Sequence, residues 1–436
     1  MVAGGMKQRL LGLASAAVVM ATAAGAQAAG YRSGDCGEFT VAMIPDTQNY
    51  VDYRHQKWSG FPFDAAEQYY AQLWWVGEHA AGAGGDIVFA THMGDVWQHY
   101  SEWMDEGHAA RGFKWMPNFG GSEVAVSPKA HTRAFEIPTA VRGYQLIDGK
   151  LPFSVLPGNH DFDALWTDPA HPPHPEAKKD GLRHVGGLTG FQSAFSADSA
   201  FFKGKPWYVG SHDGGADSAQ VFTAGKCKFL HIALQYHAPD ASLAWAAKLI
   251  QRYPGLPTIV STHDYLDRDG KPNRRSNPNN SRLDRQDNDP QMIWDEFISR
   301  QDQVFLVLSG HVGGQGYSVA ANALGHEVHQ MMADYQGRGQ TANEAGATGE
   351  DVGDGWLRLL KFKLDGERPT IEVRTYSTHY GKFASEIPEY GAWYKAHDGQ
   401  AGLSDADYLK RDEFALTLTD FHQRFGAPAT PSRQKP

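Results

Sequence analysis

Five apolar runs in this chain share one pattern, in which a strand-like stretch turns polar at its carboxyl end. Continuous apolar runs of this length, bounded by turn residues, favour β-strands that are buried on both faces. In open α/β sheets, ligands bind beyond the carboxyl ends of the strands, so we expect the five tips to converge on one site. The runs are EFTVAMIPD (38–46), DIVFATHMGD (86–95), PFSVLPGNHD (152–161), LPTIVSTHD (256–264) and QVFLVLSGH (303–311).

Helical patterns alternate with these strands. In segment 64–80, apolar residues recur at helical spacing, which predicts a helix that covers the sheet, and segments 241–253 and 290–300 predict two more. Residues 353–377 predict a β-hairpin. With 41% hydrophobic residues among 436, the chain can bury the core of one large domain or of two ordinary ones.

Three polar, turn-rich stretches interrupt the alternation of strands and helices. They predict loop insertions at 102–150, 162–190 and 267–290, of the size that forms rims or lids around a site. We expect the catalytic domain to span residues 36–383. Residues 384–436 predict a helical C-terminal extension that ends in a flexible tail.

The first residues predict a secretory signal peptide. Lys7 and Arg9 precede a short apolar run, and Ala26-Gln27-Ala28 has the small-residue pattern of a signal-peptidase site. A membrane anchor is the alternative, but the run is short and rich in Ala for a bilayer span. We expect residues 1–28 to be removed and the mature protein to be exported, periplasmic or secreted, without a membrane span.

Two cysteines, Cys36 and Cys227, each precede a strand-like run. In an exported protein, two cysteines at the same end of two strands favour one disulfide. Two free buried thiols are the alternative, because the adjacency of strands cannot be read from sequence.

Charge narrows the class of partner. The formal net charge of -10 is spread along the chain without a long basic block, so we expect no binding to duplex nucleic acid. A small phosphoester substrate is compatible with this balance if a bound metal supplies positive charge locally.

The strand tips carry oxygen and nitrogen donors. Carboxylate, amide and imidazole groups together suit Zn, Mn or Fe better than Ca or Mg alone. A carboxylate such as Asp95, which lies between the other donors in chain order, can bridge two ions about 3.5–4 Å apart. The candidate donors are Asp46, Gln48, Asp95, Asn159, His160, His263 and His311.

In chain order, the tips read D-T-Q, G-D, G-N-H-D, H-D and G-H. This ordered set resembles the calcineurin-like metallophosphoesterase superfamily, whose motifs run D-x-H, G-D, G-N-H-[E/D], H and G-H-x-H, and most closely its exported branch with a D-T-Q first motif. The likeness covers roughly residues 38–380. It implies a four-layer α/β fold (α+β), in which two mixed β-sheets pack as a sandwich flanked by helices.

The resemblance also implies two divalent metal ions and the residues that bind them. Asp46 and Gln48 would bind the first ion, and Asp95 would bridge the two. The second ion would be bound by Asn159, His263 and His311. Hydrolysis of a phosphomonoester or phosphodiester would proceed by in-line attack of a hydroxide generated at the metals.

Four residues would act beside the metal ligands. His160 would be the catalytic residue, which contacts a phosphoryl oxygen or protonates the leaving group. Asp161 would orient the turn from behind the ligands, and we expect Gln98 and Asp264 in the same outer layer.

The chain departs from the family pattern at three positions. Gly313 stands where the last motif has its second histidine, and Gln48 also replaces a histidine, so we expect the first metal site to be labile and to prefer Mn or Mg. Gln98 stands where some phosphatases of the superfamily have an aspartate that pairs with the catalytic histidine. We therefore expect His160 to be less basic than in those enzymes.

Two hypotheses on function follow. The first is an exported metal-dependent phosphoesterase with an asymmetric dinuclear site. The alternative is a degenerate protein of the same fold that keeps one metal and acts as a metal- or ligand-binding module.

Overall fold

The computed structural model of the chain describes residues 36–101, 105–110, 112, 131–168, 182–273, 287–347 and 352–426. The predicted signal peptide, the end of the predicted tail and parts of the three predicted insertions lie outside these ranges.

The first of two large β-sheets has the strand order β15-β14-β13-β1-β2-β3, and β16 pairs with β14. β1, β2 and β3 run parallel, whereas β13 to β16 are antiparallel to the strands they pair with. The strands are β1 (Glu38–Ile44), β2 (Ile87–His92), β3 (Phe153–Ser154), β13 (Trp356–Lys363), β14 (Thr370–Ser377), β15 (Lys382–Phe383) and β16 (Phe414–Thr417).

The second sheet has the order β11-β12-β10-β9-β8-β7-β6. β8, β9, β10 and β12 are parallel, and β6, β7 and β11 pair antiparallel at the two edges. The strands are β6 (Tyr208–His212), β7 (Asp217–Ala224), β8 (Cys227–Leu234), β9 (Thr258–Thr262), β10 (Val304–Ser309), β11 (Gly314–Ala321) and β12 (Glu327–Asp334). A separate hairpin joins β4 (Ala164–Asp168) to β5 (Leu182–Gly186).

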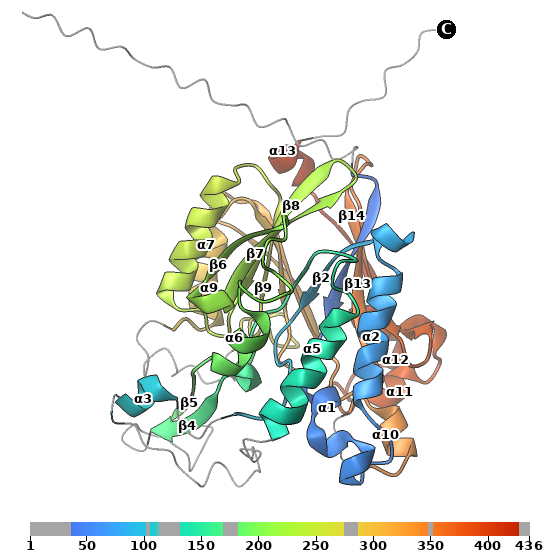
Figure 1. The fold of residues 1–436 in the computed structure, drawn as a ribbon. Coiled ribbons are helices and arrows are strands. Elements are labelled where there is room, and N and C mark those ends of the chain that lie inside the picture. Colours follow the sequence, from blue (N-terminus) through green and yellow to red (C-terminus); the bar gives the residue numbers. More distant parts are fainter. Residues whose placement is uncertain are drawn as a thin grey trace, which may run out of the picture.

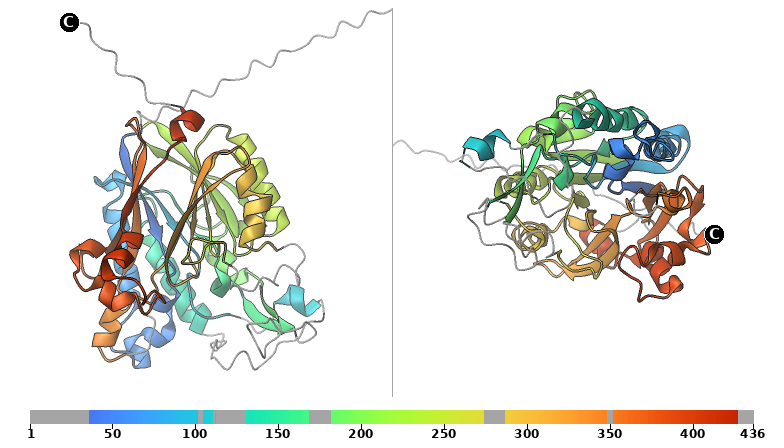
Figure 2. Two further views of the ribbon diagram at one scale, coloured as in Figure 1. Left: turned by 180° about the vertical axis from the view of Figure 1, so that it is seen from behind. Right: turned by 90° about the horizontal axis from the view of Figure 1, so that it is seen from below.

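Helices cover the outer face of each sheet, so the molecule has four layers in the order helix, sheet, sheet, helix (Figures 1 and 2). α2, α5 and α6 pack on the first sheet, and α7 and α9 pack on the second. The α-helices of the described ranges are α1 (Gln48–Val51), α2 (Ala66–Glu78), α3 (Glu106–Ala110), α5 (Ile137–Gln145), α6 (Thr189–Phe195), α7 (Asp240–Arg252), α9 (Pro290–Glu296), α10 (Gln340–Glu344), α11 (Tyr390–Tyr394), α12 (Asp405–Asp412) and α13 (Phe421–Phe425).

The predicted fold class is therefore confirmed: two mixed sheets form a sandwich flanked by helices. All five predicted strands are present, and so are the predicted helices α2, α7 and α9 and the hairpin β13–β14. Within the described ranges, the longest apolar helices fall short of what a membrane crossing requires.

Alternation along β1 shows how the sequence builds the layers. Phe39, Val41 and Met43 point between the sheets, whereas Ala42 and Ile44 point toward the helices, because successive side chains of a strand face opposite ways. Both faces are apolar, which is why the run is continuously hydrophobic.

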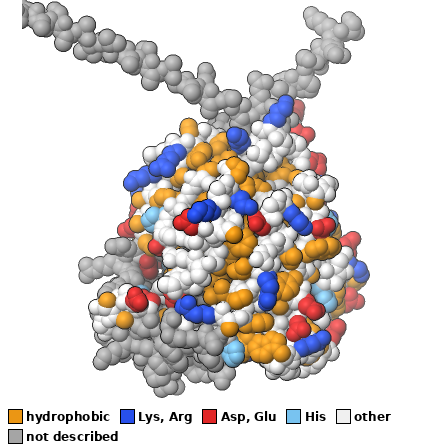
Figure 3. All heavy atoms as spheres, viewed as in Figure 1, with side chains coloured by type: hydrophobic (Ala, Val, Ile, Leu, Met, Phe, Trp, Pro, Cys, Tyr) orange, Lys and Arg blue, Asp and Glu red, His pale blue; other side chains and the backbone are white. Residues whose placement is uncertain are grey.

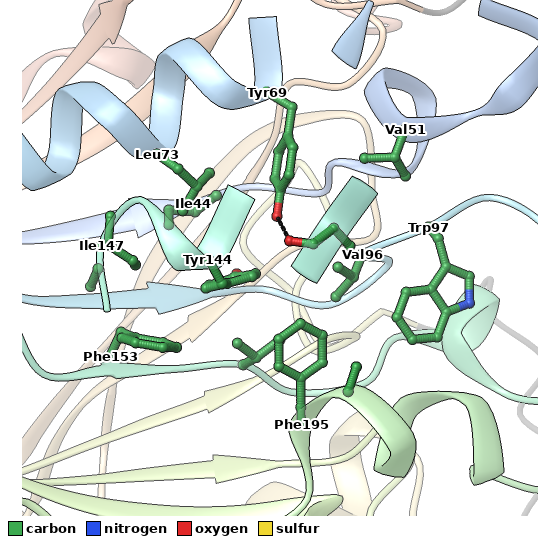
Figure 4. Close-up of a cluster of buried hydrophobic side chains, with 14 of the residues drawn as sticks. Ile44, Val51, Tyr69, Leu73, Val96, Trp97, Tyr144, Ile147, Phe153 and Phe195 are labelled. Atoms are coloured by element: carbon green, nitrogen blue, oxygen red, sulfur yellow. Dashed lines mark hydrogen bonds between the residues drawn. The ribbon is translucent and has the colours of Figure 1, made fainter. Parts of the chain in front are cut away.

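The outer core shows close packing between two helices and the sheet (Figure 4). Tyr69 of α2 packs near Tyr144 and donates its hydroxyl hydrogen to the carbonyl of Ala140, at 2.9 Å. A Cβ at Gly143 would lie 2.2 Å from the Tyr69 ring, so α5 can approach α2 this closely only with glycine at that position.

Three predicted segments differ from expectation. The stretch 162–190, predicted as a loop insertion, contains the hairpin of β4 and β5. The stretch 102–150, predicted as a loop insertion, contains α5 and the π-helical turn Thr132–Glu136, because its apolar residues find a place on the first sheet. The segment after residue 384, predicted as a helical extension, also supplies strand β16.

Buried ion pairs attach this C-terminal segment to the rest of the fold. The guanidinium of Arg338 donates to Asp398 at 2.7 Å and to Asp412 at 3.1 Å, and Arg358 donates to Asp412 at 3.0 Å. All four side chains are buried. Buried charges must be paired, so this network holds α12 and the turn at Asp398 against the sandwich.

A disulfide between Cys36 and Cys227 joins the start of the first sheet to the start of β8 in the second. The disulfide prediction is confirmed, and the alternative of two free thiols is wrong. Because the bond closes a loop across 191 residues, it lowers the conformational entropy of the unfolded chain and so stabilises the folded state.

The double variant Cys36→Ser/Cys227→Ser should lose about 2–5 kcal/mol of unfolding free energy, measured by denaturant titration. Reductant should destabilise the wild type to a similar extent and leave the double variant unchanged. A wild type that keeps its stability after mass spectrometry shows full reduction would contradict this role.

A buried imidazole links the two sheets through hydroxyl groups. His231 of β8 contacts the hydroxyl of Ser261 at 2.8 Å and the amide oxygen of Gln220 at 2.8 Å, and Ser261 contacts Thr91 of the first sheet at 3.2 Å. Burial lowers the pKa of His231 from its ordinary value of 6.5 to about 3.

Stability should therefore fall with acidification. Between pH 6.5 and 3 the unfolded chain takes up a proton at His231 that the folded chain does not, so unfolding becomes easier as the pH falls, by up to about 1.4 kcal/mol per pH unit. Denaturant titrations at several pH values give the unfolding free energy as a function of pH. This free energy should change less steeply with pH for His231→Gln than for wild type. The exposed control His79→Gln should keep the wild-type slope, and parallel curves for all three proteins would contradict the assignment.

Candidate metal centre

The five strand tips meet at one edge of the sandwich. Asp95, after β2 in the first sheet, lies 3.2 Å from the Nε2 of His263, after β9 in the second. Asp46, after β1, accepts the backbone N–H of His311, after β10, at 3.1 Å. Asn159, after β3, completes the group. The expected convergence is confirmed, and the donors come from both sheets.

Four donors surround one point. The Nε2 of His263 lies 3.1 Å from the Oδ1 of Asn159 and 3.0 Å from the Nδ1 of His311. The ligand atoms of His263, His311 and Asp95 all lie within 4.8 Å of one another. Two imidazoles, a carboxylate and an amide oxygen at this spacing are a donor set that fits a transition-metal ion.

A backbone contact fixes which nitrogen of His263 faces that point. The Nδ1 of His263 lies 2.8 Å from the carbonyl oxygen of Met93, and because a carbonyl only accepts, Nδ1 must carry the hydrogen. Nε2 is then the nitrogen that faces the other donors, which is how metal-binding histidines are commonly oriented.

Gln48 contacts Asp95 through one atom of its side-chain amide, and the other atom has no hydrogen-bond partner among the described residues. Its Nε2 donates to the Oδ2 of Asp95 at 3.2 Å, while its Oε1 is buried and contacts no donor in the described residues. A buried carbonyl oxygen without a partner is costly. This oxygen, on a side chain that contacts Asp95, fits a ligand of a cation.

The charges around the tips follow the same pattern. Burial raises the pKa of Asp46, and nearby Asp334 and Asp95 raise it further. Burial disfavours a charged His263, but Asp95 and Asp46 outweigh it and raise its pKa to about 10. Burial lowers the pKa of His311 to about 4, so its nitrogen offers a lone pair at neutral pH. A divalent cation balances such buried carboxylates.

Backbone strain also concentrates at the tips. Asp95 has φ 51° and His311 has φ 70°, a left-handed region that non-glycine residues rarely adopt. Residues held this way cluster at functional sites, because surrounding contacts must enforce the conformation. A Cβ at Gly158 would lie 2.2 Å from the Asp95 carboxylate, so glycine permits the two tips to touch.

Asp161 holds the two turns together. Its carboxylate accepts the backbone N–H groups of Val96 at 2.9 Å and Gly158 at 2.8 Å, so it ties the G-D turn to the G-N-H-D turn from behind. This placement is the one expected of a residue that orients the ligands.

His160 lies at the opening of the group. Its backbone N–H donates to the Oδ1 of Asp95 at 2.8 Å, and its Nδ1 lies 2.7 Å from the carbonyl oxygen of Gln98. Nδ1 therefore carries a hydrogen. The ring of Tyr100 stacks on the imidazole with centroids 5.7 Å apart. The partner of His160 at this position is the Gln98 backbone, not a carboxylate.

Asp264 forms hydrogen bonds with His237 and Asn273, and its charge acts on the predicted ligand His311. It accepts from the Nε2 of His237 at 3.1 Å and from the amide of Asn273 at 2.8 Å. His237 in turn stacks on Tyr236, whose ring lies 5.9 Å from the rings of His263 and His311. Asp264 thus supports the site through the loop after β8.

A second buried group of acids and histidine lies behind Gln98. Glu136 accepts the backbone N–H of His99 at 3.0 Å and lies 2.7 Å from the Nδ1 of His99, and Asp52 pairs with Arg54 at 2.7 Å. Hydrogen-bond donors already contact both carboxylates, so this group holds the loop that orients His160, and the ligand atoms of Asp52, His99 and Glu136 also lie within 4.8 Å of one another, close enough to hold a metal ion.

A cavity of about 270 Å³ opens onto the tips. Sequence reasoning missed several of its walls, above all Asp334 at the end of β12 and His397 and Asp398 in the C-terminal segment. It is lined by Gln48, Asn49, Gln98, His160, His311, Gly313, Asp334, Gln336, Gly337, His397 and Asp398.

Fold and site together define an α/β sandwich with a metal-competent donor cluster at the carboxyl edge of both sheets. No family model matches the chain. The chain is 24% identical over 300 residues to a protein of Bacillus subtilis (strain 168) named Uncharacterized protein YvnB. The match covers 67% of this chain and 19% of that protein, so the chain spans about a fifth of the relative's length. The relative's name states no activity.

Proposed function

We propose that this chain is an exported metal-dependent phosphoesterase of the calcineurin-like metallophosphoesterase type. The observation that carries the proposal is the position of Asp95. Its Oδ2 lies between the amide of Gln48 and the imidazole of His263, at 3.2 Å from each, and its Oδ1 accepts the backbone N–H of His160. A carboxylate placed between two donor sets is the arrangement of dinuclear hydrolases.

Two divalent ions, such as Mn, Zn or Fe, would polarise the phosphoryl group and lower the pKa of water at this site. Asp46, Gln48 and Asp95 would hold the first ion. The second would be held by Asp95, Asn159, His263 and His311.

His160 would move a proton at its Nε2. Because Nδ1–H donates to the carbonyl of Gln98, Nε2 is the nitrogen left to face the cavity. A protonated Nε2 there can donate to the leaving oxygen of the ester. The hydrogen bond from the His160 backbone to Asp95 keeps this imidazole at a constant place relative to the metal ligands.

The surroundings support a small substrate and export. The cavity of about 270 Å³ suits a phosphoryl group with a modest alcohol. On the face shown in Figure 3, basic and acidic side chains are interspersed, without the basic stripe of a nucleic-acid binder. The disulfide fits an oxidising compartment such as the periplasm or the exterior.

One observation favours the alternative, a metal- or ligand-binding module. Gly313 lines the cavity without a side chain where the resembling family has a metal-binding histidine, so the first donor set is poorer in nitrogen. Hydrolysis of a phosphoester by the metal-loaded protein would distinguish the two proposals.

Hydrolysis of p-nitrophenyl phosphate and bis-p-nitrophenyl phosphate should appear when the metal-stripped protein is reloaded with Mn, Zn, Fe or Mg. His160→Ala should reduce kcat about 10²–10⁴-fold and keep its metals, because it removes only the proton donor. Asp95→Asn should lose both turnover and metal.

The exposed control His79→Ala should behave as wild type. A folded, metal-loaded wild type that hydrolyses neither ester would count against the phosphoesterase proposal and favour the binding module. The ratio of the two rates would set the monoester or diester preference.

A further inference from the structure

Asp46, Gln48 and Asp95, the first donor set, have an acidic neighbour, Asp334, that the family motifs do not include. β11 begins at Gly314, and in the antiparallel pair of β11 and β12 the Cα partner of Gly314 is Asp334. Gly313, the position without the expected histidine, therefore lies beside the end of β12. Both Gly313 and Asp334 line the cavity together with Gln48.

Asp334 is held in place against the turn that carries Gln48. Its Oδ1 accepts the backbone N–H of Gln336 at 3.1 Å, and its Oδ2 accepts the side-chain amide of Gln336 at 3.1 Å. The Oε1 of Gln336 accepts from Asn49 at 2.9 Å. Each carboxylate oxygen of Asp334 thus keeps a second lone pair for another partner.

No described lysine, arginine or histidine lies within ion-pair distance of Asp334, and the positive charge of His263 acts on it only from further away. Asp334 is 1% exposed, and none of the ion pairs within the described ranges includes it. Its charge and the charges of Asp95 and Asp46 repel one another. Three buried carboxylates that repel one another need a positive charge close by.

An independent observation points to a ligand at the same place. The Oε1 of Gln48 is buried, contacts no donor in the described residues, and belongs to a side chain that lines the same cavity as Asp334. The Gln48 oxygen has no partner, and the three carboxylates repel one another. Both facts are explained if all of these groups bind one cation.

We propose that Asp334 is a ligand of the first metal ion and takes the place of the histidine that Gly313 cannot supply. The first set then consists of oxygen donors only, from Asp46, Gln48, Asp95 and Asp334. Hard ions such as Mn²⁺ and Mg²⁺ prefer oxygen, whereas the two imidazoles of the second set favour Zn²⁺ or Fe. The assignment to a two-ion centre rests on the proposed function.

The two donor sets should separate in a metal-binding experiment. Metal-stripped wild type, with the second set first loaded with one equivalent of Zn²⁺, should bind one further Mn²⁺ per chain in a calorimetric titration. Asp334→Asn should weaken that Mn²⁺ affinity about 10- to 100-fold, because it loses a charged ligand. The retained Zn²⁺, measured by elemental analysis, shows that the variant is folded.

Asp148→Asn, which alters a carboxylate paired with Lys205 on the surface, is the matched control and should bind Mn²⁺ as wild type does. Electron paramagnetic resonance of the bound Mn²⁺ adds a second reading, since loss of an oxygen ligand should change its spectrum. Unchanged Mn²⁺ affinity and spectrum in Asp334→Asn would overturn the assignment. Two bound ions in a wild type that hydrolyses no phosphoester would instead refute the proposed function and leave Asp334 as a ligand.

Discussion

The burial of Asp95 is the constraint on which the rest of the site depends. This carboxylate sits at 2% exposure where the edges of two sheets meet, and it is in contact with Gln48, His160 and His263. A charge in that position must be compensated by neighbours drawn from both sheets. Left-handed backbone at Asp95, glycine at 158 and the contacts of Asp161 all serve to keep it there.

The fold and the site residues at the ends of the five strands could be predicted because their signals are local in the sequence. A buried strand followed by polar residues is visible in one stretch of sequence, so Asp46, Asp95, Asn159, His263 and His311 could be named before their arrangement was known. The order of motifs then suggested a common edge. The same runs predict the fold class, because a strand that is apolar on both faces must be covered on both sides by other elements.

The remaining residues depend on long-range pairing that one sequence does not show. Asp334 ends an ordinary strand, and only the register of β11 against β12 brings it beside Gly313. Glu136 lies in a stretch predicted as a loop, yet it holds the turn at Gln98 that orients His160. Likewise, His397 lines the cavity from a distant part of the sequence, next to Asp398, which Arg338 binds.

The C-terminal segment belongs to the same structural unit as the metal centre. Its strand β16 extends the first sheet, its buried aspartates pair with arginines of the sandwich, and its residues 397 and 398 form one wall of the cavity. Residues after 383 therefore help to shape the cavity.

Anomalous diffraction from crystals of the protein loaded with Mn and Zn tests the central claim most directly. We predict two anomalous peaks about 3.5–4 Å apart on either side of the Asp95 carboxylate, one near Asp46 and one near His263. The absence of any peak at the strand tips, or a peak only within the Asp52, His99 and Glu136 group, would contradict the account.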